Sequence, residues 1–248
     1  MSEHDKGETA ALLRGASLGD ATEVLIQNLD ETALLGCVGM DAEALGTADA
    51  TLVSVVLDMS GSMEPHRKEV IEAYNAMIRS LAGARAATSI LVSTWAFEDV
   101  PRLLSSYESV EHKPRLTQAV YAPRGSTALH DAVLGAMTGL VAYGQRLWDE
   151  GVPTRRVLFV LSDGEDNASK ATAGAVRSAA AALARQEAYT LAYAGFGSID
   201  LASQARVIGF PHVVGAAATD SEIRRVFRQV SQSVLRVSQG SGASGFFT

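Results

Sequence analysis

Three short segments of the sequence carry oxygen-bearing side chains that could hold a metal ion. Asp58-Met59-Ser60-Gly61-Ser62 places a carboxylate and two hydroxyls on alternate residues, directly after an apolar run. Gly125-Ser126-Thr127 and Ser162-Asp163-Gly164 follow, each where a strand and a helix are predicted to meet or where a loop opens a helix. The candidate ligands are Asp58, Ser60, Ser62, Thr127 and Asp163. Their hard oxygens suit Mg²⁺ or Mn²⁺, less often Ca²⁺, and include no thiolate or imidazole that would favour zinc or copper.

The elements that must position these residues follow from the apolar pattern. From residue 51 onward, short apolar runs alternate with longer segments of helical period, which is typical of a parallel sheet flanked by helices. Residues 51–57 are predicted to form a buried central strand, and an apolar stripe from Val70 to Leu81 predicts a helix that packs on the sheet. Residues 89–97 are predicted as the next strand, with 102–107 returning antiparallel to it as an edge hairpin.

The second half of the chain continues the alternation of helices and strands. Apolar residues from Leu129 to Val141 predict a helix, and residues 157–161 predict another buried strand. The remaining predicted elements are a helix over 171–187, a strand over 188–194, a short helix over 199–208, a strand near 212–214 and a closing helix over 221–237. The sequence therefore predicts one α/β domain over residues 51–237.

Two regions give weaker signals. Residues 1–50 form an N-terminal extension with short candidate elements at 23–27 and 33–38, whose periodicity does not decide between helix and strand. Residues 238–248 have the composition of a flexible C-terminal tail, apart from Phe246 and Phe247. This aromatic pair is predicted to be either part of a mobile tail or an apolar hook that docks on a partner or on its own domain.

Composition narrows the function classes. The 248 residues carry a formal net charge of −7 with scattered basic residues, which argues against a nucleic-acid partner. Cys37 is the single cysteine, so an intrachain disulfide is impossible, which is compatible with a reducing cytosol. The polar first ten residues do not resemble a secretory signal, and no apolar segment reaches the roughly 20 residues of a membrane span. We therefore expect a soluble, cytoplasmic protein.

The ordered set of Asp58-x-Ser60-x-Ser62, Thr127 and Asp163-Gly164 resembles the metal-ion-dependent adhesion site of the von Willebrand factor A domain. The resemblance covers about residues 50–237, and the five ligand positions match without departure. It implies a doubly wound, mostly parallel open sheet with one antiparallel edge strand, with the metal at the carboxyl ends of the central strands. It also implies that Ser60, Ser62 and Thr127 bind the metal directly, while Asp58 and Asp163 hold coordinated waters or the serines.

Neutral hydroxyl ligands leave much of the charge of the cation uncompensated, so a free coordination position favours an outside anionic oxygen. The occupant that the resemblance implies is a Glu or Asp side chain of a partner protein, so the expected function is protein binding and not catalysis. Movement of Asp163 into direct contact with the metal would weaken this attraction, and the family links such switching to its last helix. The small chain looks like the stand-alone bacterial members, some of which are associated with tellurite-resistance and other stress-response systems or with chaperone-like ATPases.

The same residues bear on other possible functions. A haloacid dehalogenase-type phosphatase would need an acid where Ser60 stands, and a subtilisin-like protease would need a His-Gly motif that the chain lacks. A metal-assisted hydrolase stays an alternative, with His130 or Glu165 as its base, although no motif commits either residue to that role. A scaffold with a purely structural metal is a further alternative. A simpler explanation of the first motif is that one of its residues caps the helix that begins near Pro65, but this would account for only one of the ligand positions.

The polar and aromatic residues near the motifs have simpler explanations than metal binding. Glu64, Glu165 and Asp166 are predicted as solvated acids in the first turns of helices, where the helix dipole favours them, and Asp131 as a first-turn acid of its helix. His66 and His130 are predicted as surface or packing residues. The predicted core residues are Trp95, Phe97 and Tyr193.

Overall fold

Six strands form one sheet at the centre of the molecule. In the computed structural model, which describes residues 3–164, 166–197, 208–240 and 245–247, the strand order is β3-β2-β1-β4-β5-β6. All neighbouring pairs are parallel except β2 and β3, which are antiparallel. The strands are β1 (Ala50–Asp58), β2 (Ile90–Phe97), β3 (Pro101–Ser109), β4 (Thr154–Ser162), β5 (Tyr189–Phe196) and β6 (His212–Ala216). The predicted doubly wound, mostly parallel α/β fold with one antiparallel edge strand is confirmed.

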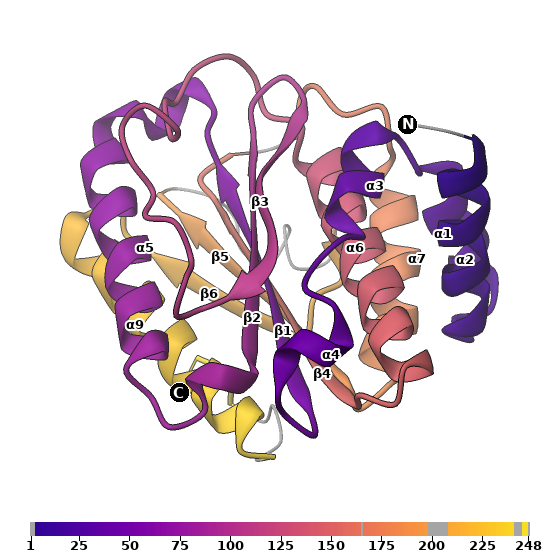
Figure 1. The fold of residues 1–248 in the computed structure, drawn as a ribbon. Coiled ribbons are helices and arrows are strands. Elements are labelled where there is room, and N and C mark those ends of the chain that lie inside the picture. The colour runs from indigo at the N-terminus through magenta and orange to yellow at the C-terminus, as the bar shows by residue number, and fades with distance from the viewer. Residues whose placement is uncertain (1–2, 165, 198–207, 241–244, 248) are drawn as a thin grey trace.

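Helices cover both faces of this sheet (Figure 1). Helices α5 (Arg67–Ala82) and α9 (Asp220–Ser238) pack on one face, where Val70, Tyr74 and Phe227 join one buried apolar cluster. Helices α6 (Leu129–Asp149) and α7 (Ala173–Ala184) pack on the opposite face with a second cluster. The short 3₁₀ helices η1 (Gly61–His66) and η2 (Ala87–Ser89) precede α5 and β2. The central strands β1 and β4 are therefore buried on both sides, which explains their continuous apolar runs.

The N-terminal extension is helical. It forms α1 (Glu3–Gly15), α2 (Asp20–Gln27), α3 (Glu31–Gly36) and α4 (Ala42–Leu45), so the candidate elements at 23–27 and 33–38 lie largely in helices. After α3 the chain runs beside the edge strand β3, where Tyr107 exchanges backbone hydrogen bonds with Val38 and Met40. The extension thereby covers part of a sheet edge that would otherwise present unpaired backbone groups.

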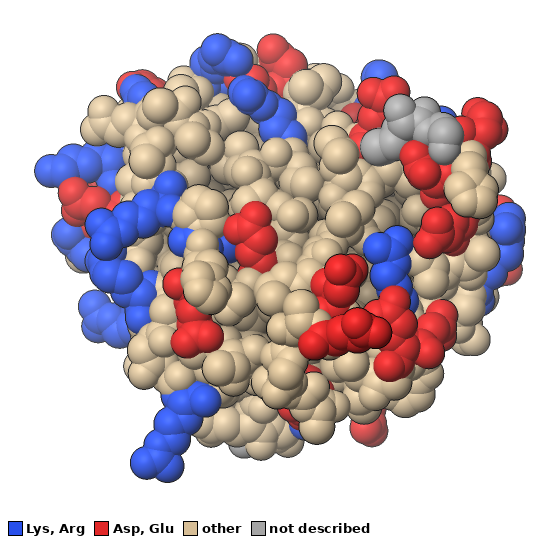
Figure 2. Space-filling view, in the orientation of Figure 1, with Lys and Arg blue, Asp and Glu red and all other residues tan. Residues whose placement is uncertain are grey.

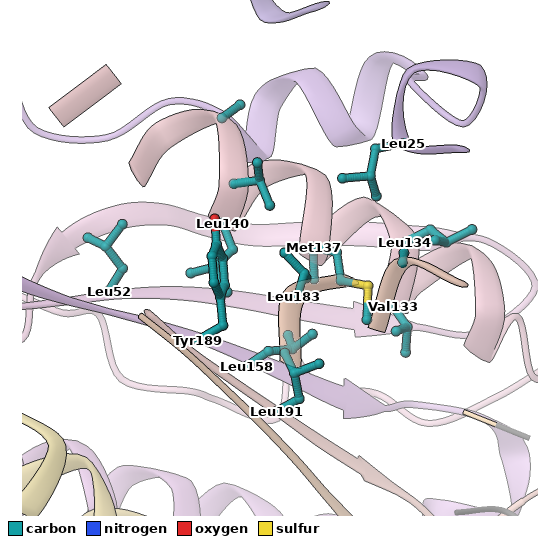
Figure 3. Close-up of a cluster of buried hydrophobic side chains, with 14 of the residues drawn as sticks. Leu25, Leu52, Val133, Leu134, Met137, Leu140, Leu158, Leu183, Tyr189 and Leu191 are labelled. Atoms are coloured by element: carbon teal, nitrogen blue, oxygen red, sulfur yellow. The ribbon is translucent and has the colours of Figure 1, made fainter. Parts of the chain in front are cut away.

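Side chains of the extension join the core on the α6 and α7 side of the sheet. Figure 3 shows Leu25 of α2 beside Leu134 of α6, while Leu158 and Leu191 rise from the sheet below the helices. Leu13 and Leu25 are fully buried. Helix α6 is consequently covered by the sheet on one side and by the extension on the other, which accounts for its almost completely buried length.

The described end of the C-terminal tail docks on its own domain. Phe246 is only 2% exposed, and its carbonyl oxygen accepts a hydrogen bond from the Ser233 hydroxyl of α9. Its ring lies 5.8 Å from the His212 ring, while Phe247 lies 6.4 Å from Phe159, both measured between ring centroids. Of the two predicted arrangements for this aromatic pair, the structure shows docking on the same chain.

The predicted elements after residue 50 are found with shifted ends. Helix α7 begins at Ala173 and not at residue 171, because the Thr172 hydroxyl caps the helix by accepting a hydrogen bond from the Ala175 N–H at 3.2 Å. Strands β1, β3, β4 and β6 extend beyond the predicted runs. Apart from Ile208, the short helix predicted over 199–208 lies outside the described residues. Within the described ranges, no helix combines the length and apolar character needed to cross a bilayer.

Charge is unevenly distributed along the chain. Residues 1–50 contain ten acidic and two basic residues, a net charge of −8, whereas residues 51–248 contain 18 acidic and 19 basic residues, a net charge of +1. Figure 2 shows Lys and Arg gathered on the left, where Figure 1 places α5 and α9. Helix α9 alone contributes Arg224, Arg225, Arg228 and Arg236. The negative net charge of the protein thus resides in its extension.

Candidate metal centre

The predicted ligands come from loops at the carboxyl ends of the two central strands. Asp58 is the last residue of β1, and Asp163 follows the last residue of β4. The next helix after β1 is α5 on one face of the sheet, whereas the next helix after β4 is α7 on the other. Because the two connections leave in opposite directions, the ends of β1 and β4 form the topological switch point of the sheet, which is where such sheets bind ligands.

Four of the five predicted ligands form one hydrogen-bonded chain. Asp58 Oδ1 accepts the Ser60 backbone N–H at 2.8 Å, and the Ser60 and Ser62 hydroxyl oxygens lie 3.0 Å apart. The Ser62 hydroxyl then donates to Asp163 Oδ1 at 2.8 Å, although 101 residues separate the two along the chain. Asp58 and Ser60 are buried, whereas Ser62 is exposed. The chain of oxygens therefore runs from the interior to the surface.

The fifth ligand, Thr127, lies next to this chain. A Cβ atom placed on Gly164 would be 3.7 Å from the Thr127 Oγ1 atom. The loop before Thr127 approaches the first motif closely, since the Gly61 N–H donates to the Gly125 carbonyl oxygen at 3.2 Å. Gly125 has a φ of +67°, a conformation that favours glycine, so its residue type has a local reason. The structure thus brings all three sequence motifs to one place.

Electrostatics at Asp58 favour the addition of a cation. The pKa of Asp58 is raised to about 6, because the effect of burial exceeds that of the hydrogen bonds from Ser162 and Ser60, which lower it, and the nearby Asp163 adds a smaller increase. None of these influences comes from a Lys or Arg side chain within the described residues. A buried carboxylate normally has a cationic or metal partner. Two carboxylates and three hydroxyls without a compensating base fit a hard divalent cation.

Several residues that hold the site in shape were not predicted as part of it. The Ser162 hydroxyl donates to Asp58 Oδ2, and the Tyr121 hydroxyl donates to the Asp58 carbonyl oxygen. The Thr127 N–H donates to Asn167 Oδ1 at 2.8 Å, and the Ser126 N–H donates to Asp99 Oδ1 at 2.8 Å. Only Ser162 belongs to one of the sequence motifs. The others contact the site across at least 27 residues of chain and leave no local pattern.

A second polar cluster lies at the start of α6. The His130 Nδ1 atom is 3.2 Å from Asp166 Oδ2, and the Ser169 hydroxyl donates to Asp166 Oδ1. The prediction that Asp166 is a solvated first-turn acid is wrong: the residue lies in a loop, and its side chain is only 13% exposed. Its carboxylate is used to hold the loop against α6. Asp131 does lie in the first turn of α6, but its carboxylate accepts N–H groups of Lys170 and Ala171.

The other polar and aromatic predictions are found as follows. Glu64 is exposed in the first turn of η1, where it lies 3.4 Å from Arg67, and His66 ends the same element in a half-buried position. Trp95, Phe97 and Tyr193 are buried in the core, as predicted. Glu165 lies outside the described residues.

Comparison with solved structures shows the same fold in proteins of low sequence identity. A von Willebrand factor type A protein from Catenulispora acidiphila is 15% identical, with a TM-score of 0.54, over 76% of this chain and 43% of that one. The pilus adhesin SpaC from Lactobacillus rhamnosus GG, in an open conformation, is 13% identical with a TM-score of 0.57, over 77% of this chain and 30% of its own. This chain therefore corresponds to less than half the length of either protein.

A third solved structure has a metal in a motif of its own. Proximal thread matrix protein 1 from the mussel byssus, with a zinc-occupied MIDAS motif, is 15% identical with a TM-score of 0.51, over 75% of this chain and 46% of its own. No curated protein matches the chain. The family model of the von Willebrand factor type A domain matches residues 53–233, which is most of the sequence. The chain belongs to the von Willebrand factor type A domain family.

Proposed function

We propose that this protein is a metal-dependent protein-binding module that holds an acidic side chain of its partner through a divalent cation. The observation that carries the proposal is the chain of oxygens from buried Asp58 through Ser60 and Ser62 to Asp163, at the carboxyl ends of β1 and β4. The hydroxyls of Ser60, Ser62 and Thr127 would hold the metal, with Asp58 and Asp163 behind them. Magnesium is the cation that this oxygen-only set suits best, with Mn²⁺ or Ca²⁺ as substitutes.

The geometry supports a ligand that approaches from outside. Ser62 is exposed at the outer end of the oxygen chain, so a cation held there would be accessible to another molecule. Hydroxyl ligands do not neutralise a divalent cation, and an incoming carboxylate would complete its charge balance. We propose a Glu or Asp side chain as this carboxylate, since vWA domains commonly mediate metal-dependent protein interactions. The resemblance to bacterial stress-response members adds the proposal that the partner belongs to an intracellular multi-protein assembly.

The same geometry gives less support to a metal-assisted hydrolase. Such an enzyme needs a general base within reach of a metal-bound water. The candidate base His130 is buried, and its Nδ1 atom faces Asp166 at 3.2 Å. A binding role needs no proton acceptor, whereas hydrolysis would need the Nε2 atom of buried His130 to reach a metal-bound water.

A peptide array tests the proposed function. The probes are peptides of seven residues with a central Glu or Asp, each paired with its Gln or Asn counterpart, measured with Mg²⁺ and again with a chelator. We expect the acidic peptides alone to bind, and only with Mg²⁺ present. Asp58→Ala and Thr127→Ala should lose this binding while far-ultraviolet circular dichroism stays unchanged, and Asp149→Ala, an exposed acid at the end of α6, is the matched control.

The possible results separate the candidate functions. Equal binding of acidic and amide peptides, or binding that survives in both site variants, would exclude the carboxylate-binding proposal. Global unfolding of Asp58→Ala and Thr127→Ala would instead support a structural metal.

A further inference from the structure

Tyr193 of β5 lies behind the candidate metal centre, on the side of the sheet that α6 and α7 cover. It is paired with Val160 of β4, which is paired in turn with Val56 of β1, and all three side chains belong to the buried cluster on this side. Ser162 and Asp58 come two residues later on β4 and β1, so their side chains point to the same side of the sheet. Tyr193 therefore lies one row of side chains behind Ser162 and Asp58.

The hydroxyl of Tyr193 points toward the site from this row. Burial raises the pKa of Tyr193, the Ser162 hydroxyl lowers it, and the charges of Asp58 and Asp163 raise it, so all three residues lie within range of the phenol oxygen. The hydroxyl is nevertheless buried without a hydrogen bond of normal geometry to any described residue. A buried donor without an acceptor is costly, so the fold gains from any state of the site that supplies one.

Ser162 is the group that can connect Tyr193 to the metal centre. Its hydroxyl donates to Asp58 Oδ2 and accepts the Gly164 N–H at 3.3 Å. One lone pair of the Ser162 oxygen is left for a further donor, and because its only proton is used at Asp58, Tyr193 has to be the donor of the pair. A hydroxyl that accepts such a bond is polarised, which strengthens the bond that it donates to the carboxylate.

We propose that Tyr193 is a positioning residue of the metal centre, whose hydroxyl donates to Ser162 and thereby fixes the Asp58 carboxylate for the cation. The inference rests on the proposed function, because it requires a divalent cation at Asp58. The charges of Asp58 and Asp163 repel each other, and a cation between them removes this repulsion. Ser162 is bonded to Asp58 and directly precedes Asp163, so we expect it to settle toward Tyr193 when the cation binds.

Tyr189, four residues earlier on β5, is a matched control with a structural hydroxyl. Figure 3 shows its ring pointing toward Leu140 of α6, on the same side of the sheet. The Tyr189 hydroxyl accepts a hydrogen bond from the Arg156 guanidinium near the start of β4, away from the metal centre. Replacing either tyrosine by Phe removes one buried hydroxyl from the same strand and leaves the ring in place.

Two measurements distinguish a positioning role from a structural one. The affinity for Mg²⁺ is measured by isothermal titration calorimetry at pH 7.5, and stability without metal by urea denaturation in chelator. We expect Tyr193→Phe to weaken Mg²⁺ binding about tenfold, as loss of a group that orients a metal-site carboxylate does, and to unfold in chelator at a urea concentration no lower than the wild type. Tyr189→Phe should show the reverse, with lower stability and the Mg²⁺ affinity of the wild type.

The tyrosine absorption spectrum gives a direct readout of the proposed bond. A tyrosine whose hydroxyl begins to donate a hydrogen bond absorbs at longer wavelength. We expect Mg²⁺ to produce such a difference spectrum in the wild type and in Tyr189→Phe, and to produce none in Tyr193→Phe.

Failure of this inference and failure of the proposed function give different results. Equal Mg²⁺ affinity of the wild type and Tyr193→Phe would overturn the inference, as would a loss of affinity that comes with lower stability in chelator, or a difference spectrum that persists in Tyr193→Phe. Absence of Mg²⁺ binding by the wild type would overturn the metal centre and this inference with it. Mg²⁺ binding without a preference for acidic peptides would overturn the carboxylate-binding proposal alone.

Discussion

The Asp58 carboxylate is buried away from water, and no Lys or Arg side chain among the described residues neutralises its charge. Without metal, its negative charge should therefore destabilise the folded protein. Asp58→Asn keeps the shape, since its Oδ1 atom can still accept the Ser60 N–H and its NH₂ group can donate to Ser162. We expect this substitution to raise the free energy of unfolding by about 2 kcal/mol in chelator at pH 7.5, measured by urea denaturation.

The same substitution should abolish any stabilisation by Mg²⁺. Wild-type protein titrated with Mg²⁺ should show a rising melting temperature, and Asp58→Asn should show none. Ser89→Ala, which changes a hydroxyl at η2 outside the site, should respond like the wild type. A melting temperature of the wild type that does not depend on Mg²⁺ would contradict metal binding at Asp58.

Lys113 is a buried base outside the site, and it predicts a pH dependence of stability. Its Nζ donates to the carbonyl oxygens of Val92 and Ser106, and burial lowers its pKa to about 7. Between pH 7 and about 10.4, the unfolded chain binds a proton that the folded chain lacks. Stability therefore rises with pH in this window, by up to about 1.4 kcal/mol per pH unit.

Unfolding at pH 7, 8 and 9 measures this dependence. Lys113→Met should remove the rise that Lys113 contributes, while Lys6→Met, at an exposed lysine of α1, should keep it. Equal pH profiles of wild type and Lys113→Met would show that Lys113 stays charged in the fold, held by its two carbonyl acceptors.

The candidate site residues that could be predicted from the sequence are those that stand together in a short motif. The spacing in 58–62 and in 162–164 follows from strand ends, which apolar runs reveal, so the candidate ligands could be named. Tyr121, Asn167 and Asp99 escaped prediction because the side chain of each contacts the site through a long-range hydrogen bond to backbone. Asp166 was misjudged for a related reason: its partner His130 lies 36 residues earlier, and no local signal indicates that contact.

At the scale of elements, the approach of α3 to α6 depends on glycine. A Cβ on Gly139 of α6 would lie 2.5 Å from the Gly36 carbonyl oxygen of α3. We expect Gly139→Ala to destabilise the protein by about 2 kcal/mol, because backbone atoms on both helices would have to move. Thermal denaturation measures the effect.

Gly7→Ala is the matched control for this prediction. Gly7 lies in α1, and a Cβ there would have no atom within 4 Å. Alanine should stabilise this helix by up to about 1 kcal/mol through its higher helix propensity. If Gly139→Ala were as harmless as Gly7→Ala, the close contact of α3 with α6 would be wrong.

Helices and strands that bury much apolar surface could be predicted from the sequence, whereas those that bury little could not. The strands 51–57 and 157–161 are buried on both faces, and their uninterrupted apolar runs identified them. The undecided candidates 23–27 and 33–38 correspond to α2 and α3, which have eight and six residues, too few for a clear periodic pattern. The docking of Phe246 was also undecided, because its partners on α9 and β6 are distant in sequence.

For the whole molecule, the extension and the sheet domain share one core. We expect a chain truncated to residues 46–248 to expose apolar surface of α6, bind the dye 8-anilinonaphthalene-1-sulfonate and lose part of its cooperative unfolding. The reason is that Leu13, Leu25 and Cys37 pack in the same buried cluster as Met137 and Leu140. A truncated chain that unfolds cooperatively at the melting temperature of the full chain would show that the extension is a separate unit.

The separation of charge between extension and domain makes the molecule an electric dipole. The isoelectric point of about 5.3 describes only the sum of its charges, and at neutral pH it predicts binding to an anion exchanger alone. The arginines of α9 and the bases of α5 form an opposite pole, which can bind a negatively charged resin although the protein is anionic overall. We expect retention on a cation exchanger at pH 7 and low ionic strength, reduced when Arg224 and Arg228 are replaced by Gln.

At low salt, such poles also align copies head to tail, so light scattering should detect association that physiological salt suppresses.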